Sequence, residues 1–164
     1  MSSPQHGLAS VVNNTVVGYA PNDATFGGID TFSYAYRNTA GTSNTSEVTV
    51  YVLNAKQDNY TMKANGDKKQ TFCTSAKNGV ANNDLPKEGI TYTFDSNIIL
   101  PNSNNQITAI VNGQTNGAFC FTMTVSKSIS EKRRIVAKRG TYQVNYNMNL
   151  DGVSAPGQAF ISVQ

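Results

Sequence analysis

Four oxygen-bearing residues in two short segments have the types and spacing to bind a hard cation: Asp58 with Asn59, and Asn83 with Asp84. Calcium takes about six to eight oxygen ligands from carboxylates, carbonyls and amides. Alternatively, the same carboxylates cap loop amides in Asx turns. The chain has ten acidic residues and lacks an Asp-x-Asp-x-Asp-Gly loop, which favours capping. The sequence therefore predicts no cofactor, with calcium as the open alternative.

A second group of residues is basic and lies close together in the sequence, at Lys132, Arg133, Arg134, Lys138 and Arg139. Such a cluster could bind an acidic glycan, a phosphate-rich polymer or an anionic lipid surface. More often it is a solvated edge that blocks unwanted strand pairing. Alternation over 133–138 and 141–148 predicts the two arms of a β-hairpin around Arg139-Gly140. The basic part of this hairpin, 131–139, is the candidate ligand-binding segment.

Nucleophilic catalysis needs a positioned base, and His6 is the single histidine. One histidine and two separated cysteines do not make a zinc set. We therefore predict that the chain is not an enzyme. Cys73 and Cys120 each lie in a strand-like run, which leaves two interpretations open: one disulfide, whose spacing would allow a bridge between two sheets, or two buried thiols.

The composition favours many short strands joined by polar turns. Of 164 residues, 14% are charged and 38% hydrophobic, and the net charge is +3. This charge is too small to indicate a nucleic-acid partner, and no apolar run is long enough for membrane insertion. The start of the chain has no basic region followed by an apolar core, so we expect no signal peptide and a fragment of a longer protein.

Period-two alternation predicts the strands themselves. Aromatic side chains share one face of the run 31–36, so we expect Phe32, Tyr34 and Tyr36 in a core, with Tyr19. Asn13-Asn14 predicts a tight hairpin between two valine pairs. Residues 100–105 are predicted to be a polar loop. The further predicted strands are 47–52, 90–94, 106–111, 118–125, 141–148 and 157–163.

The first third of the chain resembles the bacterial cadherin-like, immunoglobulin-like repeats of large surface and secreted proteins. The resemblance rests on His6-Gly7, Tyr19-Ala20-Pro21-Asn22, the run 26–34, Gly41-Thr42 and Val48-Thr49-Val50. Gln57-Asp58-Asn59-Tyr60 and the run 78–86 are similar to the opening of a next repeat. The resemblance implies an all-β fold of immunoglobulin-like β-sandwich modules: a partial module at 1–54 and a divergent one at 55–164. It also implies calcium at module junctions.

These expectations converge on a non-catalytic structural or adhesion module of a bacterial surface or secreted protein, extracellular or at the cell surface rather than periplasmic. Its expected partners are neighbouring repeats, and a glycan or a host-surface protein. One alternative is a ligand-binding module that uses its loops or the basic hairpin. Another is an accessory domain of a larger secreted enzyme. Four strands alone would leave an apolar face and an open edge, so we expect another segment to complete the first module.

Overall fold

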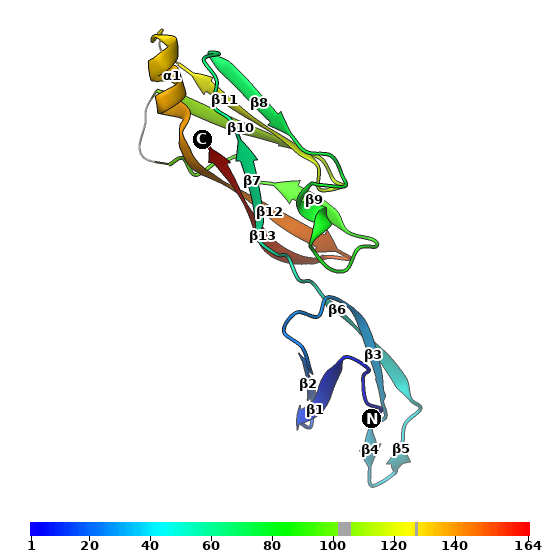
Figure 1. Cartoon of the computed structure of the whole chain (residues 1–164). Coiled ribbons are helices and arrows are strands. Elements are labelled where there is room, and N and C mark those ends of the chain that lie inside the picture. The colour runs from blue at the N-terminus through cyan, green and yellow to red at the C-terminus, as the bar shows by residue number, and fades with distance from the viewer. Residues whose placement is uncertain (102–105, 127) are drawn as a thin grey trace. The chain divides into compact units, whose positions relative to one another are not determined.

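The computed structural model of this protein describes residues 1–101, 106–126 and 128–164. The chain divides into two compact units, unit 1 (Met1–Asn54) and unit 2 (Ala55–Gln164), both built mainly from strands (Figure 1). The predicted all-β class is therefore confirmed. Most of the predicted loop at 100–105 lies outside the described residues. Among the residues described, no helix has the length and apolar character to cross a membrane.

Unit 1 consists of antiparallel pairs. Strands β1 (Gly7–Asn13) and β2 (Val16–Pro21) form the predicted hairpin around the two asparagines. Strand β3 (Gly28–Tyr34) pairs along its whole length with β6 (Ser46–Val52). The short strands β4 (Arg37–Asn38) and β5 (Gly41–Thr42) close the turn between them. The strands predicted in this part of the sequence are thus confirmed, except that β3 ends at Tyr34, before Ala35 and Tyr36 of the predicted run.

The core of unit 1 is smaller than the aromatic pattern predicted. Phe32 is buried, but Tyr34 is 41% exposed and Tyr36 is 58% exposed, so the prediction that they are core residues was wrong. Tyr36 lies beyond the end of β3, and both tyrosines line an open hollow of about 650 Å³ together with valines of the β1–β2 hairpin. Further large apolar side chains of this unit are also exposed, namely Leu8, Val11, Val12, Val16, Val17 and Ile29.

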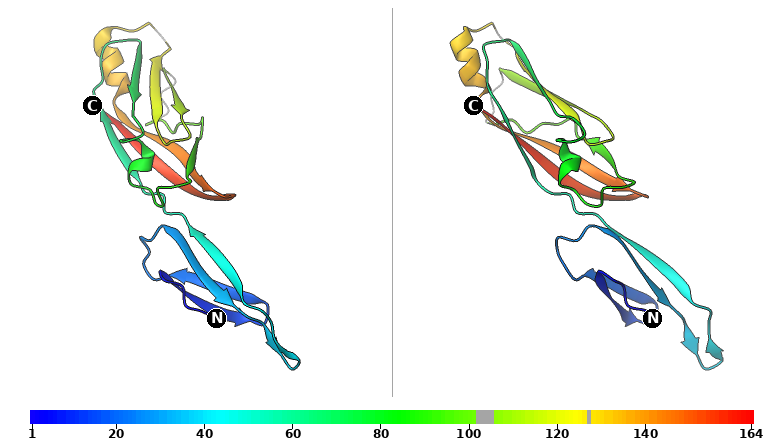
Figure 2. Two further views of the ribbon diagram at one scale, coloured as in Figure 1. Left: turned by 90° about the vertical axis from the view of Figure 1, so that its right-hand side faces the viewer. Right: turned by 45° about the vertical axis from the view of Figure 1, so that its right-hand side comes forward.

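Unit 2 is a two-sheet, immunoglobulin-like sandwich. One sheet has the order β7-β13-β12-β9, from β7 (Asp58–Met62), β13 (Val153–Val163), β12 (Gly140–Leu150) and β9 (Thr91–Phe94). The other has the order β10-β11-β8, from β10 (Ile107–Gly113), β11 (Phe119–Val125) and β8 (Lys69–Cys73). Strand β7 runs parallel to β13, and the other pairs are antiparallel. Figure 2 shows the long β12–β13 hairpin within this unit from two further sides.

The core of unit 2 follows the predicted alternation. The inward residues of β11 and β12 are buried, and they meet across the two sheets. The Phe121 ring lies 5.1 Å from the Tyr142 ring, and the Phe119 ring lies 5.6 Å from the Phe94 ring. The buried set from these two strands is Phe119, Phe121, Met123, Val125, Tyr142, Val144, Tyr146, Met148 and Leu150.

The predicted basic hairpin does not form, because residues Glu131–Lys138 are the helix α1. Glu, Lys, Arg and Ala are good helix formers, Glu131 lies in the first turn and Lys138 in the last, where each charge suits the helix dipole. Arg139-Gly140 is therefore not a hairpin turn. The arm predicted at 141–148 is correct as part of β12, but its antiparallel hairpin partner is β13, through a turn at Asp151-Gly152. A short 3₁₀ helix, η1 (Val80–Asn82), lies before β9.

Candidate functional site

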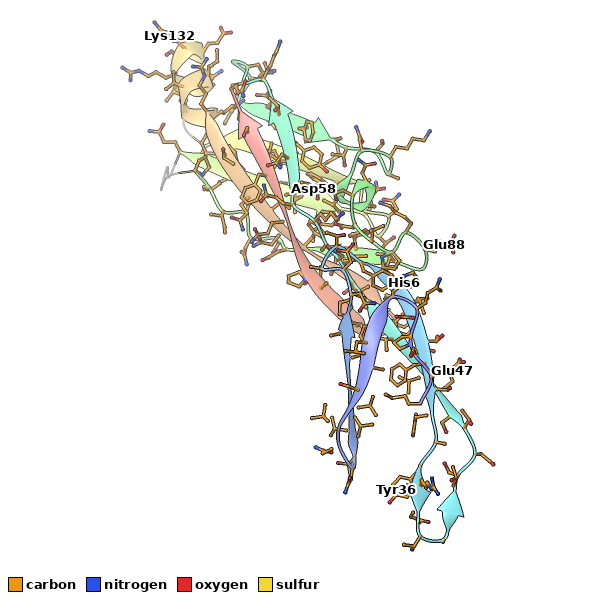
Figure 3. All side chains as sticks on the ribbon, turned by 60° about the horizontal axis from the view of Figure 1, so that its bottom comes forward. His6, Tyr36, Glu47, Asp58, Glu88 and Lys132 are labelled. Atoms are coloured by element: carbon orange, nitrogen blue, oxygen red, sulfur yellow. A yellow bond between two sulfur atoms is a disulfide. The ribbon has the colours of Figure 1, made fainter. Side chains whose placement is uncertain are left out.

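A buried pair of carboxyl groups lies where the chain enters unit 2. Asp58 begins β7, Asp84 follows η1, and both face Tyr146 in the middle of β12 (Asp58 is labelled in Figure 3). The Tyr146 hydroxyl oxygen lies 3.1 Å from Asp58 Oδ2, 3.1 Å from Asp84 Oδ2 and 3.0 Å from the Lys56 carbonyl oxygen. The Lys56 backbone N–H donates to Asp84 Oδ1 at 2.6 Å. One hydroxyl therefore joins three segments that are far apart in the sequence.

Burial and mutual repulsion make this pair bind protons tightly. Burial raises the pKa of Asp58, the Tyr146 hydrogen bond opposes the rise and the charge of Asp84 adds to it, so that the pKa is about 7. Burial likewise raises the pKa of Asp84 above its ordinary value. Two adjacent carboxyl groups out of water cannot both ionise without a large electrostatic cost. At neutral pH the pair therefore holds a proton that isolated aspartates would have lost.

The other two predicted cation ligands behave differently from each other. Asn83 donates its side-chain N–H to the Gln57 carbonyl oxygen at 3.2 Å, whereas Asn59 is exposed and accepts from Gln57 Nε2. The structure thus brings Asn83 to the carboxyl pair and leaves Asn59 on the outer face of β7. Across residues 1–101, 106–126 and 128–164 no group of three or more His, Cys, Asp and Glu side chains is placed to hold a metal ion. Both carboxyls already accept protein hydrogen bonds, which fits the capping interpretation better than a calcium cage.

The five basic residues do not form one surface. Lys132, Arg133 and Arg139 are exposed, and Figure 3 shows Lys132 on the outside of α1. Arg134 donates to the Gly66 carbonyl oxygen at 3.0 Å. Lys138 is fully buried and donates to the Asp67 carbonyl oxygen, with Asn65 Oδ1 and Gln70 Oε1 at 3.5 and 3.4 Å. Arg134 and Lys138 therefore fasten α1 to the turn between β7 and β8 instead of facing a ligand.

Cys73 and Cys120 form a disulfide, and it lies within one sheet. The two cysteines are directly opposite each other in the β8–β11 pair, with a Cα–Cα distance of 4.1 Å. A bridge between the two sheets, which the spacing would allow, is therefore not what the chain makes. The reason is parity: Phe119 and Phe121 point into the core, so Cys120 between them points outward.

The lone histidine lies in unit 1 and is not placed as a base. His6 stacks on Phe26 with ring centroids 4.6 Å apart, and its backbone N–H donates to Asp30 Oδ2 at 2.9 Å. Asp30 is buried and also accepts from the Gln5 N–H and the Tyr19 hydroxyl. Burial acts to raise the pKa of Asp30, but these hydrogen bonds outweigh it and hold the pKa below its ordinary value. Asp30 lies two residues before Phe32 and shares its buried face of β3. This alternation in the sequence could have identified Asp30 as a buried residue.

A groove on the outer face of the β9–β12–β13 sheet was not predicted. It has a volume of about 720 Å³ and lies entirely in unit 2. Among the described residues that line it, half carry amide or threonine side chains and one, Asp95, carries a carboxylate. The signal in the sequence is the outward set of β12, in which Gln and Asn alternate with the buried residues. The groove is lined by Ala55, Gln57, Thr93, Phe94, Asp95, Gln143, Asn145, Tyr146, Asn147, Pro156, Gly157 and Gln158.

No protein-family model matches this sequence, and no curated protein matches it. Among solved structures, it is similar to the endo-fucoidan hydrolase MfFcnA4 of glycoside hydrolase family 107, with 12% identity over 99% of this chain and a TM-score of 0.36. It is also similar to the protocadherin GammaB4 extracellular domain, with 11% identity over 99% of this chain and a TM-score of 0.33. A third similar structure is an I-band fragment of titin, with 13% identity over 96% of this chain and a TM-score of 0.32. The chain spans 22%, 27% and 49% of these proteins. Values this low carry nothing about activity, ligand or partner, and the fold assignment rests on the strand pairing described above.

Proposed function

We propose that this chain is a non-catalytic spacer and adhesion module of a cell-surface or secreted protein, whose unit 2 resists tension. The observation that carries the proposal is the parallel pairing of the first and last strands of unit 2. The register runs from Asp58 opposite Ala159 to Met62 opposite Val163. It continues beyond β7, where the Ala64 N–H donates to the Gln164 carbonyl oxygen at 2.7 Å.

Parallel terminal strands give the unit a specific response to tension. Because β7 and β13 run in the same direction, the chain enters at one end of this pair and leaves at the other. Pulling on the two ends then slides the strands past each other and loads all their evenly spaced hydrogen bonds together. Pulling an antiparallel hairpin open from its free ends would break the bonds one at a time. Unit 2 is therefore suited to transmit force along a modular protein.

Two further features support an extracellular spacer. A disulfide is typical of oxidising compartments. The exposed apolar side chains of unit 1, including Leu8 at 64% and Val12 at 64%, support the proposal that a neighbouring segment of the same protein packs on that unit.

The test is to stretch the full chain from its two ends by single-molecule force spectroscopy. Unfolding of unit 2 should release roughly 20 nm with the disulfide closed and about 37 nm with it reduced, at about 3.4 Å per residue. Ala64→Pro removes one N–H donor from the β7–β13 pair and should lower the unfolding force. The matched control, Gln114→Pro, removes one backbone hydrogen bond, to Ala118, in the other sheet and should leave the force unchanged. An equal decrease of the unfolding force in both variants would contradict the proposal.

A further inference from the structure

We propose that the groove on the outer face of β9, β12 and β13 binds a neutral oligosaccharide. The polar residues that carry this inference, called the amide groove below, are Thr93, Asn145, Asn147 and Gln158, with Gln143 beside them. Nothing in the spacer proposal requires this site, so the two can fail separately.

Strand register places these side chains in rows across the sheet. Asn147 is opposite Thr93 on one side and Pro156 on the other. Asn145 is opposite Gln158, and the Asp95 N–H donates to the Asn145 carbonyl oxygen at 2.9 Å. The outward groups of three neighbouring strands therefore converge on one hollow, held by continuous backbone pairing. A site built on paired strands is more rigid than one built on loops.

The lining has the chemistry that recognises hydroxyl groups. Each Asn or Gln amide offers both a donor and an acceptor, which matches the mixed donor and acceptor character of a sugar hydroxyl. The Gln143 amide donates to Asn145 Oδ1 at 2.8 Å, which fixes the orientation of both amides. Pro156, exposed on the outward face of β13, supplies apolar lining against which the C–H groups of a sugar ring can lie. An aromatic residue, Phe160, is opposite Gln143 and half-buried on the same outward face of β13.

The charge of the lining selects against acidic ligands. Within the described residues no Lys or Arg lines the groove, and its one ionisable outward group is the Asp95 carboxylate. A sulfated or uronic-acid glycan, or a nucleic acid, would meet this carboxylate without a compensating cation. The volume of about 720 Å³ lies within the usual range for small-ligand sites, so a short neutral oligosaccharide fits the hollow.

The test screens the full chain on an array of neutral β-glucans, mannans, xylans and galactans, with sulfated and uronic-acid glycans as the charged set. Titration calorimetry with the best neutral oligosaccharide then compares variants. The double variant Asn145→Ala/Gln158→Ala should weaken binding by at least about tenfold, since each lost amide leaves ligand hydroxyls unpaired. The control, Asn112→Ala, removes an exposed amide from β10 in the other sheet and should bind like the original chain.

Several outcomes would overturn the inference. One is the absence of binding to every neutral glycan on the array. Another is binding that survives in the double variant while its thermal unfolding is unchanged. A third is binding restricted to the charged set and lost in Lys132→Ala/Arg133→Ala, which would assign recognition to the exposed side of α1. Unchanged unfolding forces in the double variant would separate this site from the tension proposal.

Discussion

Asp58 and Asp84 lie against the same hydroxyl group, with a carboxyl oxygen of each 3.1 Å from Tyr146 Oη. The hydroxyl has one hydrogen and also lies 3.0 Å from the Lys56 carbonyl oxygen, so it cannot donate to all of these acceptors at once. A proton on one carboxyl supplies the missing donor. This relationship ties the entry of the chain into unit 2 to the protonation state of a buried pair.

The stability of unit 2 should therefore fall as the pH rises from about 4 to about 7. The pKa of Asp58 is about 7 in the folded chain against 3.8 when unfolded, so between these values the folded state binds the extra proton. The stability that this proton gives is therefore lost progressively across this pH range. Hydrogen exchange resolved by mass spectrometry, at a series of pH values in denaturant, measures this for unit 2 alone. Asp58→Asn should flatten the dependence, and a flat profile in the original chain would contradict the assignment.

Unit 1 provides an internal control of opposite sign in the same experiment. Hydrogen bonds from Gln5, His6 and Tyr19 hold the pKa of Asp30 below 3.8. A lowered carboxyl pKa gives stability that is present above pH 4 and is lost as the pH falls through the folded value. Acid should therefore weaken unit 1 over a range in which unit 2 is at its most stable.

The strands were visible in the sequence because burial on one face leaves a period of two. Phe121 and Met123 in β11, and Val144 and Met148 in β12, show this period plainly. The helix α1 was missed because it is only 8 residues long and Ile135-Val136 interrupts its charged residues with β-branched ones. Its Arg134 and Lys138 also bond to the turn before β8, and these contacts are not reported by any local pattern.

The candidate sites were found only in part, for a similar reason. Asp58 and Asp84 stand in short motifs, so they could be singled out locally. Tyr146, which joins them, lies 88 positions from Asp58 and belongs by parity to the core, so nothing near it in the sequence indicates a polar role. The amide groove needs the register of β9, β12 and β13, which only the folded sheet supplies.

Lys138→Met should destabilise unit 2 by about 2 kcal/mol. The ammonium group is fully buried, and its loss leaves the acceptors at Asp67 and Gln70 without their donor. Arg133→Ala on the exposed side of α1 is the matched control and should change stability by less than about 0.5 kcal/mol. Urea unfolding measures both variants. Similar small effects would mean that Lys138 does not fasten α1 to the β7–β8 turn.

Removing the disulfide should cost up to about 4 kcal/mol, the chain-entropy value for a loop of 47 residues. The double variant Cys73→Ala/Cys120→Ala tests this without a reductant. Because Cys73 is exposed and Cys120 half-buried on the outer face of the sheet, the substitution opens no core cavity, so the loss should come mainly from the unfolded chain. Urea unfolding of the variant, beside the reduced original chain, should give the same loss. A much larger loss in the variant alone would point to a packing role for the cysteine side chains.

Calcium should not raise the melting temperature of unit 2. To coordinate a cation, Asp84 Oδ1 would have to give up the Lys56 N–H at 2.6 Å, and the pair would have to release its shared proton. The measurement is thermal unfolding at neutral pH in millimolar calcium, in magnesium and in excess chelator. A ligand that binds only the folded state adds about 2.7 kcal/mol at one hundred times its dissociation constant, so real binding would be plain. A rise that calcium produces, magnesium does not, and Asp84→Asn abolishes would contradict the capping interpretation. It would make the same carboxyl pair a cation site that competes with the proton, and the pH dependence of unit 2 would then steepen in chelator and flatten in calcium.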